Sequence, residues 1–263
     1  MNRNKYKRLS QEEKDGIKEF TLKGKSLRQV SKILGIGITT IYYHVRKFKP
    51  KQFKKMEITL KDFQLGELIG SFVGDGNFYY DRNGRSRRYV IRYYLSYEDD
   101  RPYSRYLVKL LKNMNLNTRV LCRKNQGRLS SIEIRIYSKE FYNLLREYIT
   151  WEGIKTYSVR LLRGINDYSE DFLKGFIRGL MDTDGFVENY NLSLGVTSKP
   201  LILNFEDILS KFDIQYKLTI RKRDSTRKDL FLCRIHRVSL ELYRDLFGFS
   251  NPRKMNGLLN ILK

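Results

Sequence analysis

The sequence contains few of the residues that build disulfide scaffolds or zinc sites. Its 263 residues include two cysteines, Cys122 and Cys233, and two histidines, His44 and His236. Because no Cys/His cluster has the spacing of zinc ligands, any bound metal ion must be held by oxygen atoms. Both cysteines lie in apolar, strand-like stretches, so we expect two buried, reduced thiols in an intracellular protein.

Long apolar runs are also absent. No stretch approaches 18 consecutive apolar residues, and the first 14 residues lack the apolar core of a signal peptide. We therefore expect neither a membrane-spanning helix nor a membrane partner. The hydrophobic fraction of 41% is nevertheless sufficient for a buried core, which indicates a globular protein.

Acidic residues are outnumbered by basic ones. The chain has 52 Lys+Arg against 29 Asp+Glu, a formal net charge of +23. This excess is far larger than solubility requires, and it is present both in residues 1–62 and in residues 63–263. A polyanion is therefore the expected partner, with nucleic acid the first candidate, because phosphate neutralisation releases counterions.

The first fifty residues have the pattern of three short helices. Capping boxes begin at Ser10 and Ser26, and a glycine turn leads into a helix over 38–48. The stretch SLRQVSKILGIGITTIYYHVRKF resembles resolvase-like and regulator-like helix-turn-helix modules, whose second helix enters the major groove. The residues expected to face DNA are Thr39, Thr40, Tyr43, Arg46 and Lys47. A small helical bundle with a solvated basic face is the alternative. We assign residues 1–50 to this module and residues 51–62 to a basic linker that can follow a phosphate backbone.

From residue 63 onward the chain repeats itself. LGELIGSFVGDGNF (residues 65–78) and GFIRGLMDTDGFV (residues 175–187) share their spacing of small residues, and each contains an Asp-Gly pair, Asp75-Gly76 and Asp184-Gly185. This is the pattern of a duplicated unit. After each segment the order strand, strand, helix, strand, strand, helix follows. The prediction is an α+β protein with two tandem, pseudo-symmetric αββαββα half-domains, residues 63–160 and 161–263.

Each half is expected to carry a sheet with one apolar face and one basic face. In the first half Ile91, Tyr93 and Leu95 alternate with polar residues, and in the second half Leu218 and Ile220 are assigned to the apolar face. Two basic sheet faces would form a saddle on a DNA duplex. The residues expected to contact base edges or phosphates are Arg92, Arg135, Arg221, Arg223 and Arg234. The run Arg85–Arg88 is expected to form a hairpin loop that meets the DNA backbone.

The small residues have a packing purpose. Each glycine inside a helix costs about 1 kcal/mol relative to alanine, so the rows Gly66/Gly70 and Gly175/Gly179 indicate close helix–helix approach. If the two helices pack on each other, their C-terminal ends bring Asp75 and Asp184 side by side. Two such carboxylates repel each other unless cations lie between them. Oxygen ligands of this kind suit Mg²⁺, and paired metal sites can stabilise both oxygens of a phosphodiester displacement.

The two segments LIGSFVGDG (residues 68–76) and IRGLMDTDG (residues 177–185) resemble the LAGLIDADG motifs of the homing endonuclease family, a resemblance that covers residues 60–263. It implies a monomer that cleaves both strands of a long, non-palindromic double-stranded DNA site across the minor groove, leaving short 3′ overhangs. It also implies that Asp75 and Asp184 bind Mg²⁺ or Mn²⁺, with Gly74 and Thr183 beside them in the metal site, and it implies an intracellular, DNA-associated location.

The two motifs differ from each other. Asp182 occupies the acidic sixth position of the second motif, where the first has Val73. We expect Asp182 to cap a helix or form a salt bridge rather than to bind metal. The resemblance further implies a basic residue near the end of the fourth strand, where Lys139 stands; the matching position of the second half is Val238. A solvated lysine at a helix start is the alternative for Lys139.

Two other functions are compatible with the sequence. One is a transcription regulator derived from the same fold that has lost catalysis, which the presence of both Asp75 and Asp184 argues against. The other is an intron-splicing maturase, for which intron RNA would be a partner. An intein host is not expected, because the ends of the sequence lack splice-junction residues; an intron-encoded or free-standing enzyme fits better.

Overall fold

The computed structural model describes residues 9–49, 56–81, 88–188, 190–223 and 228–263. The chain divides into two compact units, Met1–Lys54 and Lys55–Lys263. Two sequence predictions fall partly outside the described residues: the basic linker at residues 51–55 and the arginine run at residues 85–87. Within the described residues, no helix is both long enough and apolar enough to cross a membrane.

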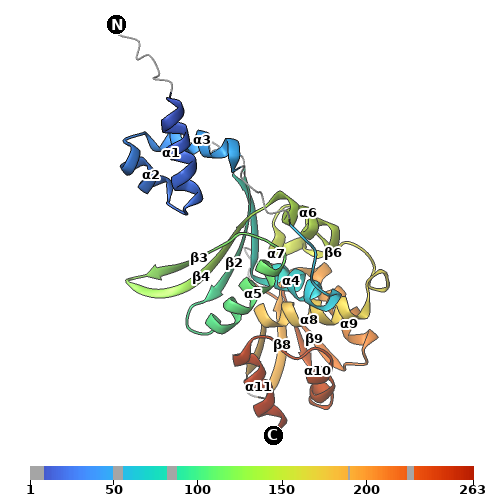
Figure 1. Cartoon of the computed structure of the whole chain (residues 1–263). Helices are drawn as coiled ribbons and strands as arrows, with labels where there is room; N and C mark the ends of the chain where they lie inside the picture. The colour runs from blue at the N-terminus through green and yellow to red at the C-terminus, as the bar shows by residue number, and fades with distance from the viewer. Residues whose placement is uncertain (1–8, 50–55, 82–87, 189, 224–227) are drawn as a thin grey trace. The chain divides into compact units, whose positions relative to one another are not determined.

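The N-terminal unit is a small three-helix module (Figure 1), made of α1 (Gln11–Leu22), α2 (Leu27–Leu34) and α3 (Ile38–Phe48). The predicted capping boxes begin α1 and α2, at Ser10 and Ser26. Gly35 ends α2 with a φ of 65°, a left-handed conformation that a residue without Cβ adopts readily. The helices enclose a small core of Ile17, Val30, Ile36 and Ile41.

The larger unit contains two halves that repeat the same order of elements. The elements of the first half are α4 (Asp62–Asp75), β1 (Gly76–Asp81), β2 (Arg88–Ser96), α5 (Arg101–Asn113), β3 (Thr118–Asn125), β4 (Arg128–Tyr137) and α6 (Lys139–Tyr148). The connecting segment contains β5 (Ile149–Thr150), α7 (Lys155–Ser158), β6 (Arg160–Leu161) and the 3-10 turn η1 (Ile165–Asp167). The elements of the second half are α8 (Glu170–Thr183), β7 (Gly185–Glu188), β8 (Asn191–Val196), α9 (Lys199–Lys211), β9 (Tyr216–Arg221), β10 (Leu230–Ile235), η2 (Arg237–Ser239), α10 (Leu240–Leu246) and α11 (Pro252–Leu262).

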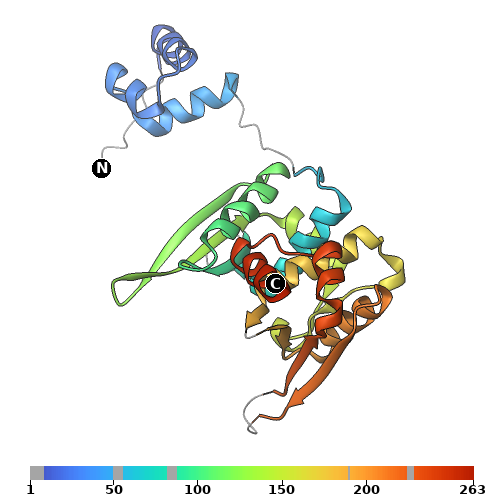
Figure 2. The ribbon, with the colours of Figure 1, turned by 90° about the horizontal axis from the view of Figure 1, so that it is seen from below.

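Each half forms a four-stranded antiparallel sheet. The strand orders are β1-β2-β4-β3 and β7-β8-β10-β9, so the second half repeats the topology of the first. Figure 2 shows the first sheet in green and the second in orange. The α+β class and the repeated αββαββα order predicted from the sequence are confirmed.

The first helices of the two halves, α4 and α8, pack backbone against backbone. A Cβ atom added at Gly66, Gly70, Gly175 or Gly179 would lie under 3.0 Å from a carbonyl oxygen of the opposite helix. Any side chain at these positions would therefore push the helices apart. The pair lies where the two halves meet (Figures 1 and 2).

The apolar sheet faces follow the predicted alternation in the central strands. Ile91, Tyr93 and Leu95 of β2 are buried, as are Leu192 and Leu194 of β8. The edge strands differ from the sequence prediction. Ile220 of β9 is 50% exposed and Cys122 of β3 is exposed, whereas Cys233 on central strand β10 is buried. An edge strand has a neighbouring strand on one side only, so alternation alone did not tell how far the helices cover it.

Candidate active site

Two aspartates mark the C-terminal ends of the packed helices. Asp75 is the last residue of α4, and Asp184 is the C-cap of α8. They are neighbours because the helix backbones touch: a Cβ on Gly74 would lie 3.2 Å from Cγ of Asp184. Burial, together with the negative charge of Asp184, raises the pKa of Asp75 to about 7. Burial also raises the pKa of Asp184. The site therefore favours any cation that neutralises the two carboxylates.

A lysine that the sequence analysis missed caps the end of α4. The ammonium of Lys155, the first residue of α7, donates to the carbonyl oxygens of Phe72 (2.7 Å), Val73 (2.6 Å) and Gly74 (3.1 Å). Burial lowers the pKa of Lys155 to about 8, while the charges of Asp184 and Asp75 act in the opposite direction. A cation at a helix C-terminus is stabilised by the orphan carbonyls and by the helix dipole.

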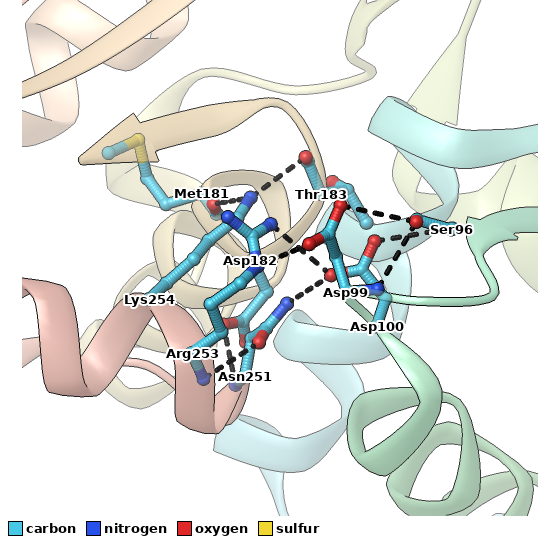
Figure 3. Close-up of polar contacts among 9 residues, drawn as sticks. All are labelled: Ser96, Asp99, Asp100, Met181, Asp182, Thr183, Asn251, Arg253 and Lys254. Carbon is cyan, nitrogen blue, oxygen red and sulfur yellow. Dashed lines mark hydrogen bonds and ion pairs between the residues drawn. The ribbon is translucent and has the colours of Figure 1, made fainter. Parts of the chain in front are cut away.

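A second missed lysine does the same for α8. Lys254 of α11 donates to the carbonyl oxygens of Met181 and Thr183, both at 2.9 Å (Figure 3). Burial lowers the pKa of Lys254 to about 8. Each motif helix therefore ends at a carboxylate with a buried ammonium on its last carbonyls. The two lysines share one feature of sequence position. Each follows the fourth strand of its half and the helix after that strand, α6 for Lys155 and α10 for Lys254.

Asp182 binds the turn that precedes the second lysine. Its buried carboxylate accepts hydrogen bonds from the backbone N–H groups of Ser250 (3.1 Å) and Asn251 (2.9 Å), in the turn that begins α11. Burial raises the pKa of Asp182 to about 8, against the lowering effect of the Asn251 bond. This contact fixes the segment that carries Lys254, and it has the capping character expected for the residue.

The same turn joins the two halves. Asn251 donates through Nδ2 to Oδ1 of Asp100 at 2.7 Å, and Asp100 is the N-cap of α5 in the first half. The Arg253 guanidinium lies 3.5 Å from Oδ1 of Asp100 and 3.8 Å from Oδ1 of Asp99. Figure 3 shows this network extending from Lys254 to the β2–α5 turn.

Lys139 lies elsewhere. It is an exposed residue in the first turn of α6, after Ser138, whose side chain caps that helix. The cations whose charges act on Asp75 are Lys254 and Lys155. Lys139 follows the end of β4 at Tyr137 by two residues, as expected, and its catalytic role stays a prediction. Its counterpart Val238 is 78% exposed.

The residues at the helix ends suit a hard divalent cation. Asp75 and Asp184 offer carboxylate oxygens, and the Gly74 and Thr183 carbonyl oxygens each also accept from a lysine. The Thr183 hydroxyl donates to carbonyl oxygens within α8, those of Gly179 and Leu180. No cluster of three or more Asp, Glu, His or Cys that could hold a metal occurs in the described part of the chain. Water and a substrate phosphate would have to complete the coordination, which is how Mg²⁺ is commonly held.

The predicted DNA-contacting residues lie on three surfaces. On the first sheet, Arg92 and Arg135 bind Glu133, with side chains that are 18% and 19% exposed. On the second sheet, Arg221, Arg223 and Arg234 line one open hollow whose wall includes Asp184. In the N-terminal unit, the exposed side of α3 carries Thr39, Thr40, Tyr43, Arg46 and Lys47. The hollow therefore connects the basic face of the second sheet with Asp184.

Comparison with known proteins gives a family match within the second half and more distant curated relatives. Residues 171–248 match the family model described as a LAGLIDADG-like domain. Two curated proteins of Methanocaldococcus jannaschii are each 26% identical to the chain. Glutamine–fructose-6-phosphate aminotransferase matches over 245 residues, 90% of this chain and 20% of that protein, and the replication factor C small subunit over 201 residues, 76% of this chain and 10% of that protein. The chain thus spans about a fifth and a tenth of the lengths of these relatives.

Solved structures extend the likeness to both halves. The homing endonuclease I-DmoI in complex with DNA and Ca superposes with a TM-score of 0.57 at 16% identity, covering 76% of this chain and 98% of that chain. Its complex with DNA and Mn gives a TM-score of 0.55 at 16% identity, covering 71% and 97%. The chain therefore contains a LAGLIDADG-like domain at residues 171–248, and its larger unit has the fold of a LAGLIDADG homing endonuclease.

Proposed function

We propose that the protein is a site-specific DNA endonuclease that uses a divalent metal to hydrolyse one phosphodiester in each strand of a long, non-palindromic target. The observation that carries this proposal is the aspartate pair at the ends of α4 and α8, with a lysine ammonium bound to the last carbonyls of each helix. I-DmoI, which shares the fold, has been solved with DNA and with Ca or Mn. Both halves lie in one chain, so a monomer suffices for an asymmetric site.

The roles of the site residues follow from their chemistry. Asp75 and Asp184 would hold Mg²⁺ or Mn²⁺, which supplies Lewis-acid activation of phosphate and water when bound. Lys155 and Lys254 would offset negative charge that builds up on the phosphate, because each is held in place by carbonyl oxygens before substrate arrives. Arg221, Arg223 and Arg234 would hold the duplex along the hollow that leads to Asp184.

Replacing either aspartate should abolish cleavage without abolishing DNA binding. We expect Asp75→Asn and Asp184→Asn to remove double-strand cleavage and to bind DNA as tightly as the wild type or more tightly, because each loses one negative charge near phosphate. The measurement is incubation with a randomised DNA library and Mg²⁺ or Mn²⁺, followed by sequencing of the new ends, with binding followed separately by retention of labelled DNA. Full cleavage by either variant contradicts the assignment. Wild-type binding without cleavage would instead favour a regulator that has lost catalysis.

The metal site predicts a pH-dependent stability. The pKa of Asp75 is about 7 in the folded protein, against an ordinary 3.8. Between these values the folded state holds a proton that the unfolded chain has released. The free energy of unfolding therefore falls as pH rises from about 4 to 7. The titration of Asp75 accounts for at most about 4 kcal/mol of this fall. Asp75→Asn has no charge to bury, so without divalent metal it should melt above the wild type at pH 8.

The control for this prediction is the metal itself. At pH 8, Mg²⁺ should raise the melting temperature of the wild type and so reduce the difference in melting temperature between the wild type and Asp75→Asn. At pH 5, where Asp75 keeps its proton, Mg²⁺ should have neither effect. Thermal unfolding with and without Mg²⁺ at both pH values measures this. A difference between the two proteins that is the same at pH 5 and pH 8 would show that Asp75 does not titrate as proposed.

Substitution of Lys155 and substitution of Lys139 should have different effects on the cleavage rate. Loss of a positioned cation at a reacting phosphate commonly costs on the order of 10²-fold in rate. We expect Lys155→Met to slow cleavage by about this factor, and to slow one strand more than the other. Lys139→Met removes the same group from an exposed position and should have little effect. Strand-resolved kinetics at saturating Mg²⁺ distinguishes the two, with melting temperatures confirming that both variants fold. Slowing by Lys139→Met alone would return the role to Lys139.

The N-terminal unit is proposed as a second DNA contact through the exposed side of α3. Deleting residues 1–54, which form a compact unit of their own, should shorten the DNA footprint and leave residual cleavage. The full-length variant Arg46→Gln/Lys47→Gln should weaken binding and make its salt dependence shallower, because two phosphate-neutralising charges are lost. An unchanged footprint and salt slope would show that α3 does not contact DNA.

A further inference from the structure

A buried glutamate lies at the centre of the basic face of the first sheet. Glu133 alternates along β4 with Ile132, Ile134 and Ile136, which face the core, so its carboxylate lies on the opposite face. It is nevertheless fully buried (0% exposed). Burial acts to raise its pKa, but hydrogen bonds from Arg135 and Arg123 outweigh this and lower the pKa below its usual range. The side chains that surround Glu133 are therefore arginines, and their hydrogen bonds stabilise the ionised form of its carboxylate.

Three arginines from three strands converge on this carboxylate. Arg123 of β3 donates through Nε (2.7 Å) and a terminal nitrogen (2.5 Å) to Oε2. Arg135 of β4 donates in the same way to Oε1, at 2.9 and 2.6 Å. Nε of Arg92 on β2 lies 3.5 Å from Oε1. Three guanidinium groups and one carboxylate leave a net positive platform on the face of the sheet.

Aromatic residues fix the platform further. Arg92 donates to the Tyr94 hydroxyl at 2.6 Å, and its guanidinium lies 4.0 Å from the centre of the Tyr79 ring. Arg135 donates to the Tyr137 hydroxyl at 3.3 Å. Free arginines give up rotamer entropy when they bind, whereas arginines held in advance give up less. This surface is therefore organised before any ligand arrives.

Arg123 differs from its two neighbours because its side chain is 51% exposed. Its Nε edge is used by Glu133, and a guanidinium has a second edge, formed by its two terminal nitrogens, that can make another bidentate contact. In DNA the group that matches such a fork is the major-groove edge of guanine, with O6 and N7 as acceptors. The position suits an arginine that contacts a base from a fixed support.

The second sheet lacks this support. Tyr93 pairs with Gly76 and Ile134, and Leu194 pairs with Gly185 and Cys233 in the same topology. By this register Arg234 corresponds to Arg135, and Arg221 corresponds to Arg123. The position of Glu133 is taken by Leu232, which offers no carboxylate. Arg123 and Arg135 are thus bound by a carboxylate in the first half. Their counterparts in the second half have a leucine at the matching position.

We propose that Arg123 is a specificity-determining residue that contacts guanine in the half-site bound by the first sheet, and that Glu133 is the positioning residue that holds it for this contact. The proposal rests on the proposed function, since it concerns the DNA that the endonuclease binds. It assigns the more stringent recognition to the first half. The second half, with Leu232 in place of the glutamate, contacts its half-site through arginines without this clamp.

The test is a binding selection that needs no cleavage. Full-length protein is incubated with randomised duplex DNA in Ca²⁺, and bound sequences are counted for the wild type, Glu133→Gln, Arg123→Met and the double variant. The control Glu147→Gln removes the same charge from an exposed position on α6. We expect the wild type to require guanine at one or more positions of one half-site. Glu133→Gln should reduce that preference by about tenfold, a loss within the range for one bidentate base contact.

Other readouts separate positioning from a merely structural role. Preferences in the other half-site and the salt dependence of total binding should match those of Glu147→Gln. The double variant should be no less selective than Arg123→Met alone, because the glutamate acts through the arginine. An unchanged guanine preference in Glu133→Gln, or a uniform loss of affinity across all sequences, would overturn the proposal. If the wild type enriches no DNA sequence, the proposed function fails as well, whereas intact wild-type cleavage with unaltered Glu133→Gln selectivity refutes this inference alone.

Discussion

The structure of the larger unit depends on one close approach, that of the α4 and α8 backbones. Gly66 and Gly70 face carbonyl groups of α8, and Gly175 and Gly179 face those of α4. Because no side chain separates the helices, the residues that follow the glycine rows meet at one end. The aspartates at the two helix termini are therefore neighbours as a consequence of packing.

This packing creates an electrostatic problem at its end, which buried cations offset. Asp75 and Asp184 repel each other, and the last carbonyls of both helices also need donors. One lysine per helix serves both purposes, Lys155 for α4 and Lys254 for α8. Lys254 depends in turn on Asp182, which holds the start of α11, and on Asn251, which ties that turn to Asp100 of the first half. Displacing the α11 turn would therefore disturb the centre and the contact between halves together.

The duplicated halves are not equal. Their topology is the same, but the centre of the first basic face is a carboxylate with three arginines, whereas the second has Leu232 in its place. Glu133 places a buried negative charge on this sheet face. Burying such a charge costs free energy of desolvation unless well-placed partners bind it. Its presence in one half alone means that the arginines of the two faces are held by different partners. A single chain with unequal faces suits an asymmetric ligand better than a symmetric one.

Local sequence patterns were sufficient to predict the features that short-range spacing encodes. Capping boxes gave the starts of α1 and α2, period-2 alternation gave the core-facing residues of the central strands, and the spacing of glycines identified the repeat and the two aspartates at its ends. These signals lie within a few residues of one another. They were enough to predict the fold class, which the structure and the family match confirm.

The distant residues that contact those aspartates and arginines become known only from the folded chain. Lys155 reaches carbonyls more than 80 positions earlier in the chain, and Lys254 reaches carbonyls more than 70 positions earlier. Neither lysine belongs to a periodic pattern, so local spacing does not single it out as a partner of the helix ends. The exposure of Cys122 and Ile220 likewise depends on their strands lying at sheet edges. Sequence periodicity reports which face a residue occupies, but what covers that face is set by chain crossings that local spacing does not encode.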